Sequence, residues 1–339
     1  MGGRGRAPGR PRLVDVAARA GVSTATASLV LRGRPGPSAA ARTAVHAAAE
    51  AIGYRPDRTA SLLARRRSHL LGVLLDITSP FHAELVRALD DAAAEHGLDL
   101  VLSTVTRRRD EAGAAETLLD FRCEALVVLG PQLPAAALDA LGGSVPTVVV
   151  GRTGTARTTG VLASDDAGLE LAVDHLVDLG HASIAYVDGP RGPIAGARRR
   201  GFRAAMRRHG LSARCLVVPG GATEDAGVAA AGSLPAGPSA PTAVVCFNDR
   251  CAIGVRDALL RAGRSVPGDV SVVGYDDSPL ARLGTVGLTS VSQDPAGLAG
   301  ATVSVLARLL DGDAAGRAHD VVIPPRLVVR SSTAPPAAR

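Results

Sequence analysis

Carboxylate and amide side chains stand where three short apolar runs of the chain end. They are Asp76, Asn248 with Asp249, and Asp276 with Asp277. At the carboxyl ends of parallel strands, such groups converge on a crevice and can hydrogen-bond the hydroxyls or ring nitrogens of a small molecule. The sequence therefore favours a small-molecule binding site.

Motifs for catalysis are missing from the sequence. It has no Ser/His/Asp order, zinc-ligand spacing or phosphate-binding loop, and its loose glycine pattern at 151–160 is not a strand–GxGxxG–helix unit. We therefore expect no enzyme activity, no cofactor and no metal. The four cysteines have no metal-like spacing and are expected to be small buried side chains in a reducing compartment. They are Cys123, Cys215, Cys246 and Cys251.

A second group of polar side chains lies near the start of the chain. Ser23, Thr24, Thr26 and Ser28 place four hydroxyls within six positions. In the first half of a recognition helix, hydroxyls can contact the phosphates and base edges of a DNA groove. The alternative is a capped helix whose polar residues only face water.

Three short helices are expected to position these hydroxyls, over 13–20, 24–32 and 38–52. Gly21 can end the first helix in a left-handed conformation, and Ser23 can cap the second. Small side chains along the first two helices allow them to cross closely. This pattern predicts a helix-turn-helix.

Charge is unevenly distributed along the chain. Residues 1–67 hold 13 Arg and three acidic residues, a net charge of +10, whereas residues 68–339 hold 25 Arg and 29 acidic residues, a net charge of −4. A basic head on an acidic body is typical of a polyanion-binding module. A disordered Arg-rich tail is the alternative, and we expect residues 1–12 to be one.

The body of the chain alternates between apolar runs and amphipathic helical segments, such as 81–97, 167–179 and 249–262. This alternation predicts parallel α/β sheets, and two sheets suit its length better than one. The runs are 70–76, 98–104, 125–130, 147–151, 183–189, 242–247 and 270–276. None approaches the roughly 18–20 residues that span a bilayer, and the N-terminus has no signal-like apolar region, so we expect a cytoplasmic protein.

The N-terminal segments resemble the DNA-binding head and hinge of the lac repressor family of bacterial transcription regulators. The matching segments are LVDVAARAGVSTATASLVLRG (13–33), SAAARTAVHAAAEAIGYRPD (38–57) and RTASLLARRRSHLLGVLLD (58–76). The resemblance continues to residue 330. It implies an all-α helix-turn-helix head and a periplasmic-binding-protein-like type I core of two Rossmann-like subdomains.

The resemblance also implies a division of the chain into five parts. They are a disordered tail (1–12), the head (13–57), a hinge helix or linker (58–68), the effector-binding and dimerisation core (69–330) and a second disordered tail (331–339). The chain is expected to cross between the core subdomains near 160 and over 290–325. The final RSSTAPPAAR has no leucine heptads, so we expect a dimer and no tetramer.

By resemblance, Thr24, Ala25 and Leu29 contact base edges, and Ser23, Thr26 and Ser28 contact phosphates. Leu63 enters the minor groove beside Ala60, and Leu13 and Arg58 complete the DNA-binding set. Leu29 stands where many relatives carry Arg, and Asp57 where Asn is usual. Because positions 24, 25 and 29 carry no Arg, Asn or Gln, base recognition should rely on apolar contacts with thymine methyl groups.

The resemblance assigns an effector site between the two subdomains. DITSPFHAEL implies Asp76, Ser79, Phe81 and His82, and the segments ARRRGF, CFND, GYDD and VSQD imply Arg198, Asn248, Asp276 and Gln293. Strand-end caps are the alternative for Asn248 and Asp276, a solvated surface for Arg198 and an ordinary helix start for His82. Either Asp165 or Asp166 can occupy a further position. Ala222 stands where some relatives stack an aromatic ring on the sugar.

The resemblance predicts a homodimeric repressor that binds a pseudo-palindromic operator under the control of a sugar or sugar derivative. A regulator of the same fold that responds to a purine or another metabolite is the first alternative. A solute-binding protein, and a regulator that has lost its effector response, are the others. The sequence does not tell an inducer from a corepressor.

Overall fold

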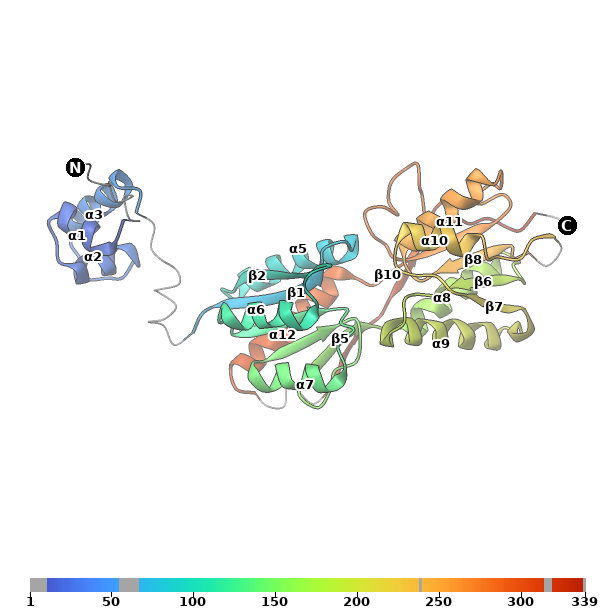
Figure 1. Cartoon of the computed structure of the whole chain (residues 1–339), viewed down its shortest axis with the longest axis horizontal. Helices are drawn as coiled ribbons and strands as arrows, with labels where there is room; N and C mark the ends of the chain where they lie inside the picture. Colours follow the sequence, from blue (N-terminus) through green and yellow to red (C-terminus); the bar gives the residue numbers. More distant parts are fainter. Residues whose placement is uncertain (1–10, 55–66, 238–239, 314–318, 338–339) are drawn as a thin grey trace, which may run out of the picture. The chain divides into compact units, whose positions relative to one another are not determined.

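The computed structural model describes residues 11–54, 67–237, 240–313 and 319–337. The chain divides into two compact units, Met1–Ser68 and His69–Arg339. Of the tail expected over 1–12, residues 1–10 lie outside the described residues, and Arg12 is described as the residue that caps α1. The hinge helix over 58–66 and the DNA contacts Arg58, Ala60 and Leu63 also lie outside the described residues. Figure 1 shows the elements of both units.

The first unit is the predicted three-helix head. It consists of α1 (Leu13–Ala20), α2 (Thr24–Leu31) and α3 (Ala39–Ala51). Gly21 ends α1 in the left-handed region with φ of 67°, and the Ser23 Oγ accepts the backbone N–H of Thr26 at 3.1 Å to cap α2. Mostly small side chains form its buried core, which allows the close helix crossing that the sequence predicts. The buried core residues are Val16, Ala17, Ala27, Val30, Val45, Ala48 and Ala49.

The second unit holds two six-stranded sheets, which confirms the predicted fold class. The first has the order β11-β5-β4-β3-β1-β2 and the second β12-β10-β9-β8-β6-β7. All pairs are parallel except β10 with β12. The strands are β1 (Leu70–Asp76), β2 (Asp99–Val105), β3 (Ala125–Leu129), β4 (Thr147–Val150), β5 (Thr159–Ala163), β6 (Ile184–Val187), β7 (Cys215–Val218), β8 (Ala243–Cys246), β9 (Ser271–Asp276), β10 (Thr289–Ser292), β11 (Val321–Ile323) and β12 (Arg326–Val328).

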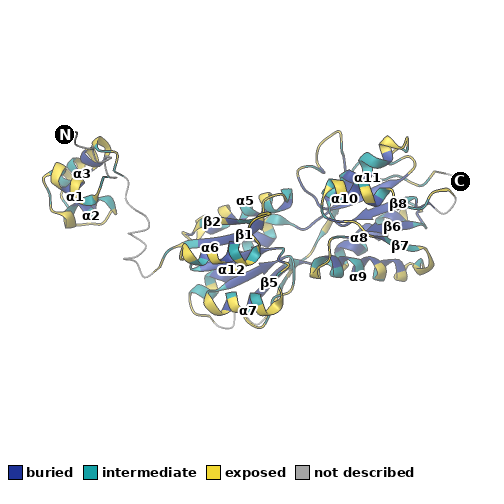
Figure 2. Cartoon of the chain, viewed as in Figure 1, coloured by how far each residue is buried: buried dark blue, intermediate teal, exposed yellow. Residues whose placement is uncertain are grey.

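Helices cover both faces of each sheet, so the central strands are buried, whereas the edge strands β2, β7, β11 and β12 are partly exposed (Figure 2). The first subdomain has α5 (Pro80–Glu95), α6 (Glu111–Asp120), α7 (Ala135–Ser144) and α12 (Pro295–Leu310). The second has α8 (Asp165–Asp178), α9 (Pro193–Arg208), α10 (Glu224–Ala231), α11 (Asp249–Arg261) and the 3-10 turn η1 (Ser212–Arg214). Helices α5 and α12 pack on one face of the first sheet, and α8 and α9 on one face of the second.

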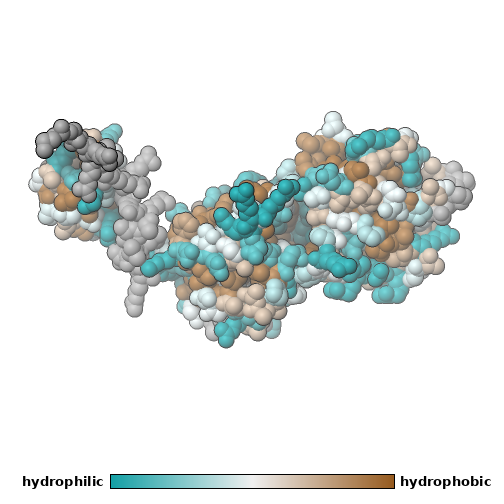
Figure 3. Space-filling view, in the orientation of Figure 1, coloured by the Kyte–Doolittle hydropathy of each residue, from teal (hydrophilic) through white to brown (hydrophobic). Residues whose placement is uncertain are grey.

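The chain passes between the two subdomains at Ser164, at Gln293–Asp294 and at Pro324–Pro325. Each subdomain is therefore assembled from separate stretches of sequence, and three short connections can act as a hinge. Figure 3 shows hydrophilic side chains gathered where the subdomains meet.

The expectation of a disordered tail from residue 331 is wrong for residues 331–334. Ser332 is buried, and its Oγ donates to the Val272 carbonyl at 2.6 Å and accepts the N–H of Thr289 at 2.8 Å. The carbonyl of Ala334 lies 2.9 Å from the His181 Nε2. These hydrogen bonds hold the segment on the second sheet in spite of its Pro- and Ala-rich composition.

No single helix of the described residues is long and apolar enough to cross a membrane. Helices α1 and α2 reach that apolar character only as a pair, and the chain bends by 104° between them. The described residues also contain no group of His, Cys, Asp and Glu side chains that could hold a metal ion.

Candidate functional site

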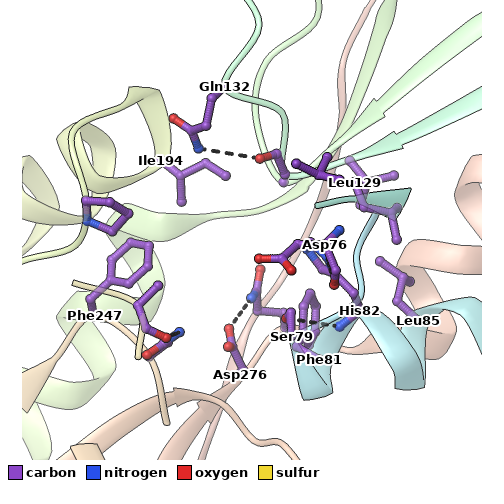
Figure 4. A pocket seen from close by; sticks show the side chains of 18 of the residues that line it. Asp76, Ser79, Phe81, His82, Leu85, Leu129, Gln132, Ile194, Phe247 and Asp276 are labelled. Carbon is purple, nitrogen blue, oxygen red and sulfur yellow. Dashed lines mark hydrogen bonds between the residues drawn. The ribbon is translucent and has the colours of Figure 1, made fainter. Parts of the chain in front are cut away.

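A cavity of about 340 Å³ lies between the two subdomains, at the carboxyl ends of their strands. All eight residues that the sequence assigns to an effector site line it. They are Asp76, Ser79, Phe81, His82, Arg198, Asn248, Asp276 and Gln293. In Figure 4, Phe247 lies across the cavity from Asp76 and His82. The structure thus brings together segments that are more than 200 residues apart.

Arg198 of α9 is the central charge of the cavity wall, and it is only 5% exposed. Its guanidinium is stacked between the rings of Phe247 and Tyr275, at 4.8 and 3.7 Å from their centroids. The Nε donates to Asp165 Oδ1 at 3.0 Å, and an Nη donates to the Phe247 carbonyl at 2.6 Å. The solvated-surface alternative for Arg198 is therefore wrong.

Asp276 lies beside Arg198 at the end of β9, with 3.9 Å between its Oδ1 and the second Nη of Arg198. Gln293 donates from Nε2 to the same Oδ1 at 2.6 Å. Burial raises the pKa of Asp276 from 3.8 to about 7, although the charge of Arg198 opposes the shift. No described residue donates a hydrogen bond to Asp276 Oδ2 or Gln293 Oε1, so both oxygens are open to a ligand.

Asp165 is the acidic residue behind this cluster. It accepts the hydrogen bond from Arg198 and a second one from the Tyr275 hydroxyl at 3.1 Å. Burial raises its pKa and the charge of Arg198 lowers it, with burial the larger effect. Asp166 makes neither contact, and neither acid lines the cavity, so Asp165 orients Arg198 from outside it.

Asn248 lines the cavity and also caps α11, as its alternative interpretation holds. Its Oδ1 accepts the Cys251 N–H at 2.9 Å, and its Nδ2 donates to the Ala222 carbonyl at 3.1 Å. The amide therefore fixes the loop that carries Ala222. One Nδ2 hydrogen remains for a ligand.

The polar groups of the first subdomain are bonded mainly to one another. Asp76 Oδ1 accepts the N–H and the hydroxyl of Thr78 at 2.8 Å each, and the Ser79 Oγ caps α5 by accepting the N–H of His82. The His82 Nδ1 lies 3.2 Å from the Asp76 N–H. Burial lowers the pKa of His82 more than Asp76 raises it, which favours a neutral ring. Phe81 belongs to the core and also lines the cavity.

The structure adds lining residues that the sequence does not assign. Gln132 follows β3, so the strand-end rule would have found it. The carboxylate of Glu111 accepts the N–H groups of Gln132 and Leu133 at 2.8 to 3.1 Å, a contact across 21 residues that no local pattern predicts. Ile194 and Phe247 add apolar surface to the cavity.

The first unit carries the residues assigned to DNA. Thr24, Ala25 and Leu29 are exposed, and Leu29 is 42% exposed although it is a large apolar side chain. Ser23 is also exposed, and its hydroxyl is bonded to that of Thr26 at 2.9 Å. Ser28 is half-buried, and Leu13 packs against the core of the head. An exposed Thr–Ala–Leu surface therefore exists on α2.

Two family models match the chain. The model for bacterial regulatory proteins of the lacI family matches residues 12–57, and the model for the periplasmic binding protein-like domain matches residues 173–333. The regulator MalR of Streptomyces coelicolor is 36% identical over 341 residues, with 95% of this chain and 96% of MalR covered. The regulator GalR of Escherichia coli is 34% identical over 283 residues, with 82% of each covered. The chain belongs to the lacI family of bacterial regulatory proteins.

Solved structures agree with this LacI-family assignment. A LacI transcriptional regulator from a Rhodococcus species is 47% identical, with a TM-score of 0.76 over 78% of this chain and 98% of that chain. The lac repressor dimer, bound to operator and the anti-inducer ONPF, is 29% identical, with a TM-score of 0.81 over 96% of this chain and 99% of that chain. This LacI-family protein is therefore a DNA-binding transcriptional regulator, and not an enzyme, as the sequence predicts.

Proposed function

We propose that this LacI-family regulator is a repressor whose affinity for operator DNA is controlled by a sugar or sugar derivative in the cavity between its subdomains. The observation that carries the proposal is the buried cluster of Arg198, Asp276 and Gln293, which presents two open acceptor oxygens and a cation to the cavity. The other five predicted lining residues are proposed to complete the effector site.

The charges of this cluster favour a neutral, hydroxyl-rich ligand. Arg198 is balanced by Asp165 and, above pH 7, also by Asp276, so this cluster itself has no surplus positive charge for a phosphate or carboxylate. The other lining arginines are Arg250, which is paired with Glu224, and the exposed Arg191. Neighbouring hydroxyls of a sugar can donate to Asp276 and Gln293 while they accept from Arg198. The rings of Phe81 and Phe247 offer apolar contact to the C–H face of such a ring.

For DNA, we propose that α2 enters the major groove, with Thr24, Ala25 and Leu29 at the base edges. Ser23, Thr26 and Ser28 then face phosphates, and Leu13, Arg58, Ala60 and Leu63 complete the contacts. The net charge of +10 on residues 1–67 supports this role. Likeness to the operator-bound lac repressor dimer supports a homodimer on a pseudo-palindromic site. It also supports the division into head, hinge and core that the sequence suggests. Because such a regulator acts on DNA, we propose that the protein is cytoplasmic.

A thermal-shift screen of the full chain against neutral sugars, sugar phosphates and purines tests the effector class. A ligand at 100 times its Kd adds about 2.7 kcal/mol to stability. We expect a neutral sugar to stabilise the wild type and not Asp276→Asn. Stabilisation by a purine would support the alternative regulator of the same fold, and stabilisation by no compound would favour a regulator without effector response.

A further inference from the structure

Arg282, in the loop after β9, reaches from the second subdomain to the first. Its two Nη atoms donate to the two carboxylate oxygens of Glu84 on α5, at 2.8 and 3.2 Å. A guanidinium that binds both oxygens of a carboxylate fixes orientation as well as distance. The Glu84 side chain is 12% exposed and the Arg282 side chain is 45% exposed, so the carboxylate is largely shielded from solvent while the guanidinium is not.

The guanidinium of Arg282 also binds Asp277, the residue after the cavity acid Asp276. An Nη of Arg282 donates to the Asp277 carbonyl at 2.6 Å, and Arg330 donates to the Asp277 carboxylate at 2.6 Å. Asp276 and Asp277 have φ values of 110° and 50°, conformations that L side chains rarely adopt. Such backbone persists only where its surroundings impose it, and both arginines bind this dipeptide.

A second arginine crosses the cleft in the same manner. Arg250 of α11 binds Glu224 in its own subdomain through Nε and Nη2, and its Nη1 donates to the Thr78 carbonyl of the first subdomain at 3.1 Å. Thr78 in turn donates to the cavity acid Asp76. Each of the two arginines is thus connected to one acid of the cavity wall: Arg282 binds the residue that follows Asp276, and Arg250 binds the threonine that donates to Asp76.

We propose that Glu84, Arg282 and Asp277 form a strut, outside the cavity, that sets how far the two subdomains open. They are positioning residues of the effector site, and the inference rests on the proposed function for its biological meaning. None of the three lines the cavity. Without the strut the two subdomains separate at the hinge more often, and the closed arrangement seen in the structure becomes less populated.

Thiol trapping measures this opening without effector or DNA, so its result is independent of the proposed function. Leu129→Cys, in the cavity wall, places a thiol that a bulky maleimide reaches only when the cleft opens. In this background we expect Glu84→Gln and Arg282→Gln each to raise the rate of modification about fivefold. The double variant should be no faster than the faster single variant, and Arg282→Lys should restore part of the protection.

Internal controls separate opening from unfolding. Cys123 is buried in the core of the first subdomain away from the cavity, so its modification reports unfolding and should not change. Glu95→Gln on α5 and Arg308→Gln on α12 alter exposed charges outside the strut. The proposal would be overturned by an unchanged rate of modification at Leu129→Cys in both strut variants, or by a double variant whose rate increase is the product of the two single increases. It would also be overturned if Cys123, or Leu129→Cys in the two control variants, were modified faster by the same factor.

Discussion

Replacement of Asp276 by Asn should remove a specific pH dependence of stability. Burial raises the pKa of this carboxyl to about 7, compared with 3.8 in a model compound. The folded protein therefore holds one more proton at this site between the two values than the unfolded chain does. Its contribution to stability is complete below pH 3.8 and is lost as the pH rises through 7.

The size of the effect follows from proton linkage. One proton of difference changes the free energy of unfolding by about 1.4 kcal/mol per pH unit. Between pH 5 and pH 7 the wild type should lose about 2 to 3 kcal/mol through Asp276, since titration is partial near its pKa. Asn at this position can still accept the Gln293 hydrogen bond, and Asp165 still balances Arg198, so the variant should fold.

Urea unfolding of the full chain, followed by circular dichroism at several pH values from 5 to 8, measures this difference. Subtraction of the variant from the wild type cancels the groups distant from Asp276, and the charge interaction of Asp276 with Asp249 and Asp165 stays in the difference. We expect the difference to fall steadily with rising pH. A flat difference would show that Asp276 is ionised throughout and that attraction to Arg198, and not burial, sets its pKa.

Three further outcomes are expected. Arg198→Ala should abolish the effector response but leave operator binding intact in an anisotropy titration; a variant that still responds with unchanged ligand affinity would remove Arg198 from the site. Leu63→Ala should weaken specific DNA binding far more than non-specific binding, because the phosphate contacts survive, and it should reduce DNA bending. An unchanged ratio of specific to non-specific affinity would reject a role for Leu63 in the minor groove. Sedimentation should give a dimer, and a stable tetramer at micromolar concentration would contradict the account.

Local patterns predicted much of the architecture and the site. Gly21 and Ser23 mark helix ends by their own backbone chemistry, and the structure places those ends where they indicate. Asp76 and Asp276 end parallel strands of different sheets, so each sheet alone places its acid at the carboxyl edge that faces the cavity. These positions depend on neighbours in the sequence, which is why the sequence could reveal them.

Contacts between distant segments could not be predicted in this way. Glu111 reaches the cavity because a loop 21 residues later bonds to it. Asp165 differs from Asp166 in its contacts with Arg198, which comes from another helix, and with Tyr275, which comes from a strand of the second sheet. Residues 331–334 are ordered because His181 and Ser271 bind their backbone, a fact that their Pro- and Ala-rich composition conceals.

Control of operator affinity by a ligand in the cavity is the function proposed for this regulator. Its most direct test is an anisotropy titration of an operator, selected by the full-length protein from random DNA, with and without the sugar that stabilises the protein in the thermal-shift screen. We expect the sugar to change the operator Kd of the wild type by about 5- to 150-fold, and not that of Asp276→Asn. Equal affinity with and without the sugar in the wild type, or an equal change in the variant, would contradict the account.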